Sequence, residues 1–416
     1  MIASSPLKNN NNPMKKIKII EAGNELGLGG TEYTIQLISK YLNKDNFEVT
    51  VVGVKEGGAR VKLIQELGIN VVVLNGDLNK LARLLQETDV FHWHGDGSLN
   101  PELFAVVKAN KPKLVLMTNI FGLYNHSGFY DIVDYDLFVS KMILVRRMLT
   151  DRDLEDDFAS KRRALSNPVD VNHINSLLPT NSELKAFKKQ NNLQNSFIVG
   201  RVGYSDNAKF DLITLDGFAE FAKKVAHAKF LLVGATSEIL EYAKALNILD
   251  KLIVFDTTLD LKQLLMYYSA IDIFLAASKI GESFGMFIAE AMTVGIPVVT
   301  INTPGQDNAQ IELVDNGQTG FVVSRDKEKI ADVLFFLYED EKIREILSES
   351  AKRKVSKEYK ADKIVKSLEN LICSHLYSAI DINSKSLVKN YTQETVNDYI
   401  NRCSDLWEPE IKRQMF

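Results

Sequence analysis

Short apolar runs alternate with longer amphipathic segments along most of this 416-residue chain. The runs are continuously apolar, as in strands buried on both faces of a parallel sheet, and the segments between them fit helices. The sequence therefore predicts parallel sheets with helices on both faces. The predicted strands are Lys16–Glu21, Phe47–Val54, Asn70–Leu74, Asp89–Trp93, Lys113–Thr118, Tyr135–Val139, Ser196–Val202, Lys229–Val233, Lys251–Phe255, Ile271–Leu275 and Pro297–Ile301, and the main predicted helices are Thr31–Tyr41, Asp211–Val225, Leu261–Ser269 and Phe284–Val294.

The alternation is interrupted near Pro168, where a polar stretch rich in Asn, Lys and Gln extends to Asn195. The chain is also too long for one ordinary hydrophobic core. We therefore expect an α/β fold with two doubly wound, Rossmann-like domains facing a cleft and a C-terminal helical extension. The expected parts are a disordered tail at 1–14, an N-terminal domain at 15–170, a C-terminal domain at 171–355, and helices at 356–416 that return to the N-terminal domain and include Thr392–Trp407.

The composition argues against several classes of protein. A net charge of −4 is unlike that of a dedicated nucleic-acid binder, which carries a basic surplus. Cys373 and Cys403 lack metal-ligand spacing and indicate a reducing compartment rather than a disulfide framework. The polar start of the chain has no apolar segment like that of a signal peptide, and no apolar run approaches the roughly 18 residues that span a bilayer. We expect a cytoplasmic protein whose membrane contact, if any, is peripheral.

One basic stretch is a candidate for such contact. Lys141, Arg146 and Arg147 lie on a short amphipathic segment, which could touch anionic lipid or a lipid-linked acceptor. A solvated helix face is the commoner explanation, because nearby acidic residues dilute the basic patch.

The segment from Glu282 to Glu290 carries the strongest functional signal. Glu282 lies beyond a predicted strand, where open α/β sheets bind their ligands. Glu290 has apolar neighbours, among which a carboxylate is costly to bury unless a partner such as a ribose diol donates to it. The alternative is a dipole-stabilised acid followed by a solvent-exposed one. Four residues after Glu282 place their amides at a helix N-terminus that suits a phosphate or a sugar hydroxyl: Ser283, Phe284, Gly285 and Met286.

Two cations follow the predicted strand Ser196–Val202. Arg201 lies at its end, and Lys209 is expected to begin the next helix. Two cations beyond a strand end can hold a diphosphate and offset charge on a leaving group. An ordinary surface pair is the alternative, and it is the commoner explanation for two such residues taken alone.

In the N-terminal domain, Gly29, Gly30 and Thr31 follow the first predicted strand and begin a helix. Glycines here allow a ligand to approach the backbone closely. The segment is not a dinucleotide fingerprint, because Glu32 occupies the sixth position of Gly-x-Gly-x-x-Gly. A tight strand–helix turn is the structural alternative.

His92 and His94 end another predicted strand, and we interpret His92 as a residue that faces the core. A His-x-His pair can bind metal, but no third ligand with suitable spacing is evident, so no metal site is predicted. The Asp-x-Asp strings at 134–136 and 151–153 are interpreted as chance occurrences, because short motifs recur without function.

Taken together, these segments resemble the family 4 retaining glycosyltransferases. Glu282 and Glu290 match that family's E-x7-E motif, with Ser-Phe-Gly after the first glutamate. The match continues through Ala291-Met292 and Gly295-Ile296-Pro297-Val298-Val299. The resemblance covers roughly Lys16 to Leu371 and is strongest in the C-terminal domain. It implies the GT-B fold, in which the N-terminal domain takes the acceptor and the C-terminal domain binds a nucleotide-sugar.

The resemblance also implies roles on the donor side. Glu290 would bind the donor ribose and Glu282 would contact the transferred sugar near the reaction centre. Arg201 and Lys209 would hold the donor phosphates. The segment Val254–Thr258 is expected to line the base pocket, with Thr258 as a donor-binding residue.

On the acceptor side, the resemblance places Gly29 and Gly30 over the donor phosphates and the acceptor, with Thr31 beside them. His94 matches a histidine at the cleft edge. Two positions depart from the family: Phe210 stands where a glycine usually follows the lysine, and Asn119 stands where relatives commonly carry a histidine near the donor.

We therefore expect a retaining, hexosyl-type glycosyltransferase that needs neither a cofactor nor a metal. It would move a sugar from a UDP- or GDP-type donor to a glycan, lipid-linked or protein acceptor. The alternatives are a catalytically weak GT-B protein that acts as a binding partner of another protein, and a nucleotide-sugar epimerase.

Overall fold

The computed structural model describes residues 15–123, 128–150, 160–378 and 386–408. They divide into two compact units. The first contains the described residues up to Pro168 and those of Tyr359–Thr395. The second contains Val169–Glu358 and the described residues from Val396 onward. The expected tail at 1–14 and the Asp-x-Asp string at 151–153 lie outside the described residues.

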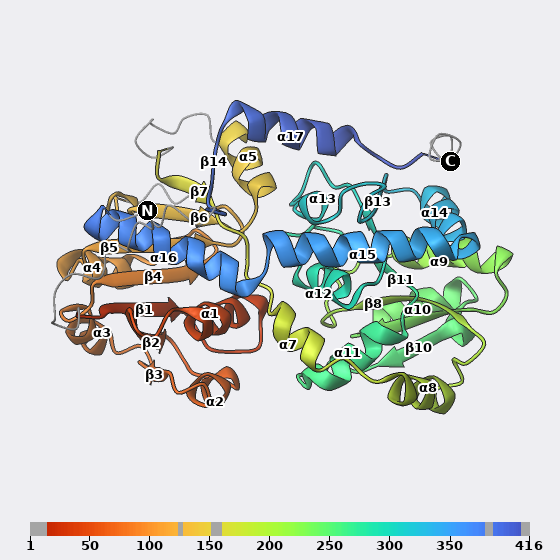
Figure 1. The fold of residues 1–416 in the computed structure, drawn as a ribbon, viewed down its shortest axis with the longest axis horizontal. Helices are drawn as coiled ribbons and strands as arrows, with labels where there is room; N and C mark the ends of the chain where they lie inside the picture. Colours follow the sequence, from red (N-terminus) through yellow and green to blue (C-terminus); the bar gives the residue numbers. More distant parts are fainter. Residues whose placement is uncertain (1–14, 124–127, 151–159, 379–385, 409–416) are drawn as a thin grey trace, which may run out of the picture. The chain divides into compact units, whose positions relative to one another are not determined.

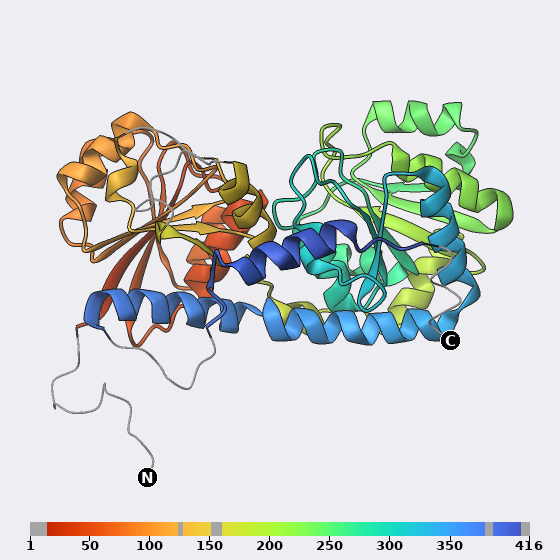
Figure 2. The same cartoon turned by 90° about the horizontal axis from the view of Figure 1, so that it is seen from above.

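The first unit is built on an eight-stranded sheet in the order β14-β7-β6-β5-β4-β1-β2-β3. Its neighbouring strands are parallel except for the edge pair β14 and β7. Helices lie on both faces of the sheet (Figures 1 and 2). The elements are β1 Ile17–Gly23, α1 Gly30–Tyr41, β2 Phe47–Gly53, α2 Arg60–Gln65, β3 Asn70–Val73, α3 Leu78–Leu85, β4 Val90–Gly95, α4 Pro101–Ala109, β5 Leu114–Asn119, η1 Tyr130–Ile132, β6 Tyr135–Phe138, α5 Lys141–Thr150, β7 Arg162–Ala164, α16 Ala361–Tyr377 and β14 Lys389–Asn390.

Helix α16 belongs to the core of the first unit, although the second unit precedes it in the sequence. Its Glu369 accepts a hydrogen bond of 2.7 Å from the backbone N–H of Asn43, just beyond α1. Each buried Leu or Ile side chain contributes about 1.5–3 kcal/mol, so the apolar face of α16 is a large part of this core. Its buried members pack with residues of β1, α1 and β5, and they are Ile364, Val365, Leu368 and Ile372.

The second unit has a six-stranded parallel sheet in the order β10-β9-β8-β11-β12-β13. The order reverses beside β8, where β8 is flanked by β9 and β11. The elements are α7 Val171–Ser176, α8 Asn181–Gln190, β8 Phe197–Val202, α9 Ile213–Lys224, β9 Ala228–Val233, α10 Ser237–Ala245, η2 Leu249–Lys251, β10 Leu252–Phe255, α11 Leu261–Ala270, β11 Ile273–Ala276, α12 Met286–Val294, β12 Val298–Ile301, α13 Gln310–Leu313, β13 Gly320–Val323, α14 Lys327–Glu339, α15 Glu341–Glu358 and α17 Gln393–Ser404.

The predicted fold class is confirmed: each unit is a Rossmann-like, parallel α/β domain. All the predicted strands are present, with bounds that differ by two residues at most. The short strands β7, β13 and β14 were not predicted, because two to four residues carry little periodicity. The C-terminal helices also divide differently: residues 396–408, assigned from sequence to the N-terminal domain, belong to the second unit.

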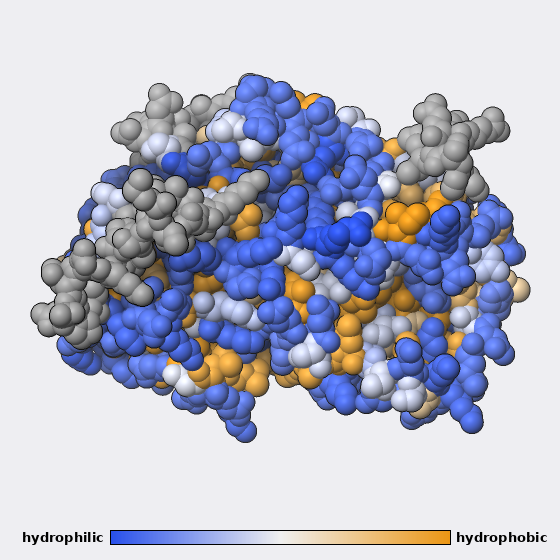
Figure 3. All heavy atoms as spheres, in the orientation of Figure 1, coloured by the Kyte–Doolittle hydropathy of each residue, from blue (hydrophilic) through white to orange (hydrophobic). Residues whose placement is uncertain are grey.

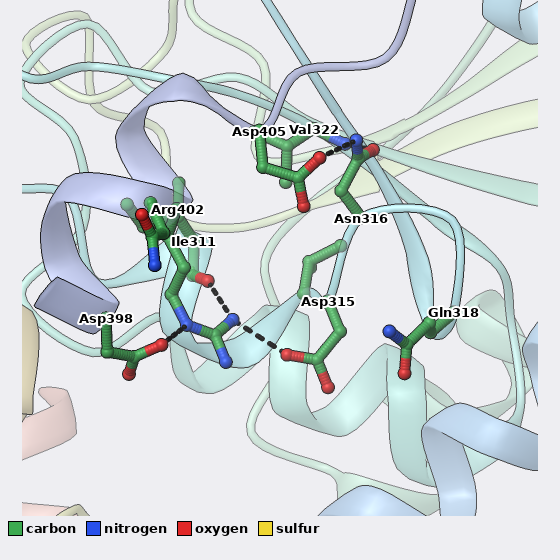
Figure 4. A pocket seen from close by; sticks show the side chains of 10 residues that line it. Ile311, Asp315, Asn316, Gln318, Val322, Asp398, Arg402 and Asp405 are labelled. Carbon is green, nitrogen blue, oxygen red and sulfur yellow. Dashed lines mark hydrogen bonds and ion pairs between the residues drawn. The ribbon is translucent and has the colours of Figure 1, made fainter. Parts of the chain in front are cut away.

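Arg402 fastens this C-terminal segment to the second unit. From α17 it donates to the carboxylates of Asp315, at 2.7 Å, and Asp398, at 2.8 Å. It also donates to the backbone oxygen of Ile311 at 2.8 Å (Figure 4). A polar cavity of about 340 Å³ lies beside these bonds, and it contains none of the site residues predicted from sequence.

The described surface is largely hydrophilic in the view of Figure 3, with apolar residues in small groups. Within the part of the chain that the structure describes, no helix has the length and apolar character that a bilayer span requires.

Trp407 anchors the segment that follows α17. It is 3% exposed, packs against Phe321 and Phe336, and donates its backbone N–H to Val322 at 2.7 Å. Trp407→Ala would leave a cavity in place of the indole ring, and the surrounding side chains cannot fill it completely. The substitution is therefore expected to lower the free energy of unfolding of the second unit by about 3–5 kcal/mol. Urea unfolding followed by circular dichroism measures this. The control Ile400→Ala, at a 54% exposed side chain, should cost about 0.5 kcal/mol or less; equal effects would contradict the anchoring role.

Candidate functional site

Arg201 ends strand β8 and is buried, with 5% of its surface exposed. Its guanidinium donates to the backbone oxygens of Ala277 and Lys209 and lies 4.8 Å from the ring centre of Phe210. Burial lowers the pKa of Arg201 to about 10, although acidic neighbours that include Glu282 oppose the shift. The side chain therefore braces two loops, and its charge acts on the site without being exposed to a ligand.

The sequence predicts that Lys209 begins a helix, and this prediction is wrong. Helix α9 begins at Ile213, so Lys209 lies in the preceding loop with its side chain exposed. The loop is fixed beside it because Phe210 is 5% exposed, joins the hydrophobic core and forms a β-bridge with Ser278. Phe210, which stands where the family usually has a glycine, thus anchors the loop. Lys209 remains an available cation.

Glu282 follows β11 in a loop, and hydrogen bonds fix its backbone on both the N–H and the carbonyl side. Its backbone N–H donates to the side chain of Gln310 at 3.1 Å, and its backbone oxygen accepts from Ala309 at 2.8 Å. The side chain is 6% exposed, and Oε1 has no hydrogen-bond partner among the described residues. Burial raises the pKa of Glu282, while the charges of Lys209 and Arg201 oppose that rise. The three predicted catalytic residues are therefore within electrostatic reach of one another.

The helix after this loop begins two residues later than predicted. It begins at Met286 rather than at Phe284, because Gly285 has a left-handed backbone with φ +95° that helix geometry cannot include. No side chain caps the start of α12 at Met286, so its first N–H groups are available to an anion. Ser283 is already engaged, since its hydroxyl donates to Asp307 at 2.8 Å.

Glu290 lies one helical turn or more inside α12 and is half-buried. Oε2 accepts a 2.8 Å hydrogen bond from the hydroxyl of Tyr268 on α11. Burial raises the pKa of Glu290 to about 7, and the bond from Tyr268 offsets only part of that rise. A carboxylate in this setting gains from a further donor, which the predicted ribose contact would supply.

Thr258, the predicted base-side residue, lies in the loop after β10. Its hydroxyl donates to Gln263 at 3.0 Å and accepts from the backbone N–H of Asp260 at 3.1 Å. The apolar side chains of Val254 and Leu259 on either side of it are 41% and 59% exposed. Both apolar side chains are thus open to solvent, and the hydroxyl of Thr258 bonds only to residues close to it in the sequence.

In the first unit, Gly29 precedes α1, and Gly30 and Thr31 form its first turn. Both glycines are exposed, and no side chain caps the helix start. A Cβ atom at Gly29 would lie 2.5 Å from the carboxylate of Glu32, whereas one at Gly30 would meet nothing within 4 Å. The turn is thus an open helix N-terminus, which suits an anionic or hydroxyl-bearing ligand.

His94 is not at an exposed edge. It is 2% exposed, and its Nε2 lies 2.6 Å from Oε2 of Glu21. His92 is fully buried as predicted, with Nδ1 2.9 Å from the same carboxylate oxygen. Spacing within the sequence missed Glu21, because it comes from the neighbouring strand β1, in register with His92.

Asn119 is also buried rather than exposed to a ligand. It ends β5 and is 0% exposed. Its amide donates to the backbone oxygen of Leu123 at 2.9 Å and to Asp136 at 3.4 Å. Asp136 also accepts from the hydroxyl of Tyr130 at 2.7 Å. The departure from the family's histidine therefore lies in a structural network of the first unit.

Gly281 fixes the loop that carries Glu282. Its φ is +69°, and a Cβ atom would lie 1.5 Å from the backbone oxygen of Asp307. Gly281→Ala should therefore cost at least about 1–2 kcal/mol and loosen the loop. Thermal melting and faster hydrogen exchange at Ala309, whose N–H bonds Glu282, would report this. Gly305→Ala is the matched control, since nothing lies within 4 Å of its Cβ position. Exchange as slow as in the control would refute the constraint.

Comparisons with known proteins bear on the family and the fold. Residues 194–340, in the second unit, match the family described as glycosyl transferases group 1. N-acetyl-alpha-D-glucosaminyl L-malate synthase of Bacillus anthracis is 25% identical over 322 residues, which span 76% of this chain and 68% of that protein.

Two solved structures resemble this chain over most of its length. The glycosyltransferase from Rickettsia africae ESF-5 has a TM-score of 0.72 at 18% identity and covers 87% of this chain and 99% of its own. Anabaena Alr3699/HepE, solved in complex with UDP-glucose, has a TM-score of 0.70 at 19% identity and covers 86% of this chain and 100% of its own. The chain thus has the GT-B fold, and its second unit carries the region shared by the glycosyl transferases group 1 family.

Proposed function

We propose that this protein transfers a sugar from a nucleoside-diphosphate sugar to an acceptor, with retention of anomeric configuration. The observation that carries the proposal is the Glu282 carboxylate. It is buried and keeps one oxygen without a partner among the described residues. The charges of Lys209 and Arg201 act on it and oppose the rise of its pKa that burial causes. A sugar hydroxyl could donate to that oxygen, while the cations balance its charge.

The donor would bind along the loops at the carboxyl ends of β8 and β11. Lys209 is the exposed cation for the diphosphate, and the uncapped start of α12 adds N–H donors for the same charge. We expect Arg201 to contribute its field and the shape of the loops rather than a direct contact, because its side chain is buried and two of its N–H groups donate to backbone oxygens. Stabilisation of the departing diphosphate would then supply most of the catalysis.

Glu290 would hold the donor ribose, and its hydrogen bond from Tyr268 leaves acceptor capacity for a diol. HepE was solved with UDP-glucose, which favours a UDP-type donor among the expected UDP and GDP classes. We place the acceptor, a glycan, lipid-linked or protein group, on the first unit near Gly29 and Gly30, where α1 begins uncapped.

A panel of UDP- and GDP-sugars tests the proposal directly. Slow nucleotide release by hydrolysis should occur with one donor class and accelerate when acceptors are added. Glu282→Gln keeps the size of the side chain and an acceptor oxygen but removes the negative charge, so release should fall strongly, by about tenfold or more. Binding without turnover would favour the partner-protein alternative, and an altered nucleotide-sugar without released nucleotide would favour an epimerase. Neither binding nor release with any donor would refute the proposal.

The titration of Glu290 gives the proposal a pH dependence. Because its pKa is about 7, the side chain is mostly protonated below that pH and ionised above it. A carboxylate is the stronger acceptor by about 1 kcal/mol, so affinity for a UDP-sugar should rise up to about fivefold as pH rises through 7. Calorimetry at several pH values measures this for the wild type and for Glu290→Gln, whose affinity should stay flat. A parallel rise in both proteins would show that Glu290 is not the titrating group.

A further inference from the structure

A cluster of three ionisable side chains lies inside the first unit, apart from the residues assigned above to the donor. Strands β1 and β4 are parallel neighbours with Glu21 in register with His92. Successive side chains of a strand point to opposite faces, so His92 and His94 share the face on which Glu21 lies. Among the described residues, these three form a group whose metal-ligating atoms all lie within 4.8 Å of one another.

The cluster is closed to solvent. Glu21 and His92 are 0% exposed, and His94 is 2% exposed. Oε2 of Glu21 lies 2.6 Å from Nε2 of His94 and 2.9 Å from Nδ1 of His92. The two imidazole rings are 4.1 Å apart between their centres, and both contact the same carboxylate oxygen.

The hydrogen bonds of the protein do not satisfy this cluster. Oε1 of Glu21 has no partner among the described residues. Nδ1 of His92, although 2.9 Å from the carboxylate, has no hydrogen-bond partner there either. A buried carboxylate oxygen and a buried ring nitrogen left in this state each destabilise the folded protein, because neither regains the hydrogen bond that it made to water. A proton or a metal ion between Nδ1 and the carboxylate would satisfy both atoms.

We propose that Glu21, His92 and His94 bind one transition-metal ion of the Zn²⁺ class. Nδ1 of His92, Nε2 of His94 and one oxygen of Glu21 provide three ligand atoms, and the unpartnered Oε1 of Glu21 could complete the set of four that zinc prefers. Two imidazole ligands select zinc and its transition-metal neighbours over Mg²⁺ or Ca²⁺, which prefer oxygen.

A neighbouring strand supports the orientation of one ligand. Nε2 of His92 lies 2.8 Å from the hydroxyl of Thr118 on β5. Ligation through Nδ1 leaves the ring proton on Nε2, where it donates to Thr118, as metal-bound histidines commonly do to an outer partner. Because the cluster has no exposed position for a substrate, the ion is structural and joins β1 to β4.

The test uses the full chain, stripped with a chelator, dialysed and then exposed to Zn²⁺ alone. Metal analysis after gel filtration should find about one ion per chain, and Co²⁺ in its place should give the intense visible absorption of a tetrahedral site. Glu21→Gln should bind less than about a tenth as much as the wild type, since the amide lowers ligand strength. His173→Gln, at an exposed histidine on α7, is the control and should bind like the wild type.

The wild type alone decides the question if Glu21→Gln does not fold. A stripped wild-type protein that takes up no Zn²⁺ and gives only the weak spectrum of hydrated Co²⁺ would overturn the proposal and leave a proton shared by Glu21 and the histidines. Uptake that is equal in folded Glu21→Gln would overturn it as well, because the ion would then bind elsewhere.

Discussion

Dehydration of charged side chains is the constraint on which the polar parts of this structure depend. Each parallel sheet is covered on both faces, so an ionisable residue at a strand end loses its water unless it lies in the loop beyond. Arg201 is compensated by backbone oxygens, and Glu290 by the hydroxyl of Tyr268. Glu21 and Glu282 each keep one carboxylate oxygen without a partner among the described residues. One of these incompletely compensated acids lies in the proposed donor site of the second unit, and the other in the proposed metal site of the first.

The sequence predicted the fold because the strands of a parallel sheet are long apolar runs, and their separation by helices fixes the architecture. It failed for β7, β13 and β14, where three or four residues at most pair at or near a sheet edge. It also failed in the last part of the chain. The helix at Gln393–Ser404 was expected, but its packing depends on Arg402 reaching Asp315, a contact between residues 87 positions apart that amphipathic periodicity cannot reveal.

The sequence predicts a candidate site from three positions. Glu282 and Lys209 follow predicted strands, and Glu290 lies within a predicted helix. What sequence could not supply was the environment of each side chain. Arg201 was expected to contact phosphate, yet it is buried under a loop by Phe210, the residue that departs from the family. His94 was expected at the cleft edge and Asn119 near the donor, and both are buried inside the first unit. Their partners, Glu21 and Asp136, stand on other strands, and only the sheet register brings them together.

The distribution of the first unit over the sequence has a consequence for biosynthesis. Its core needs α16, whose buried residues begin at Ile364, so the strands made first lack part of their covering while the whole second sheet is synthesised. On the ribosome, the second sheet can therefore mature before the first has its final core. The emerging N-terminal strands would meanwhile expose an apolar face, which makes this half of the chain the expected client of chaperones during translation.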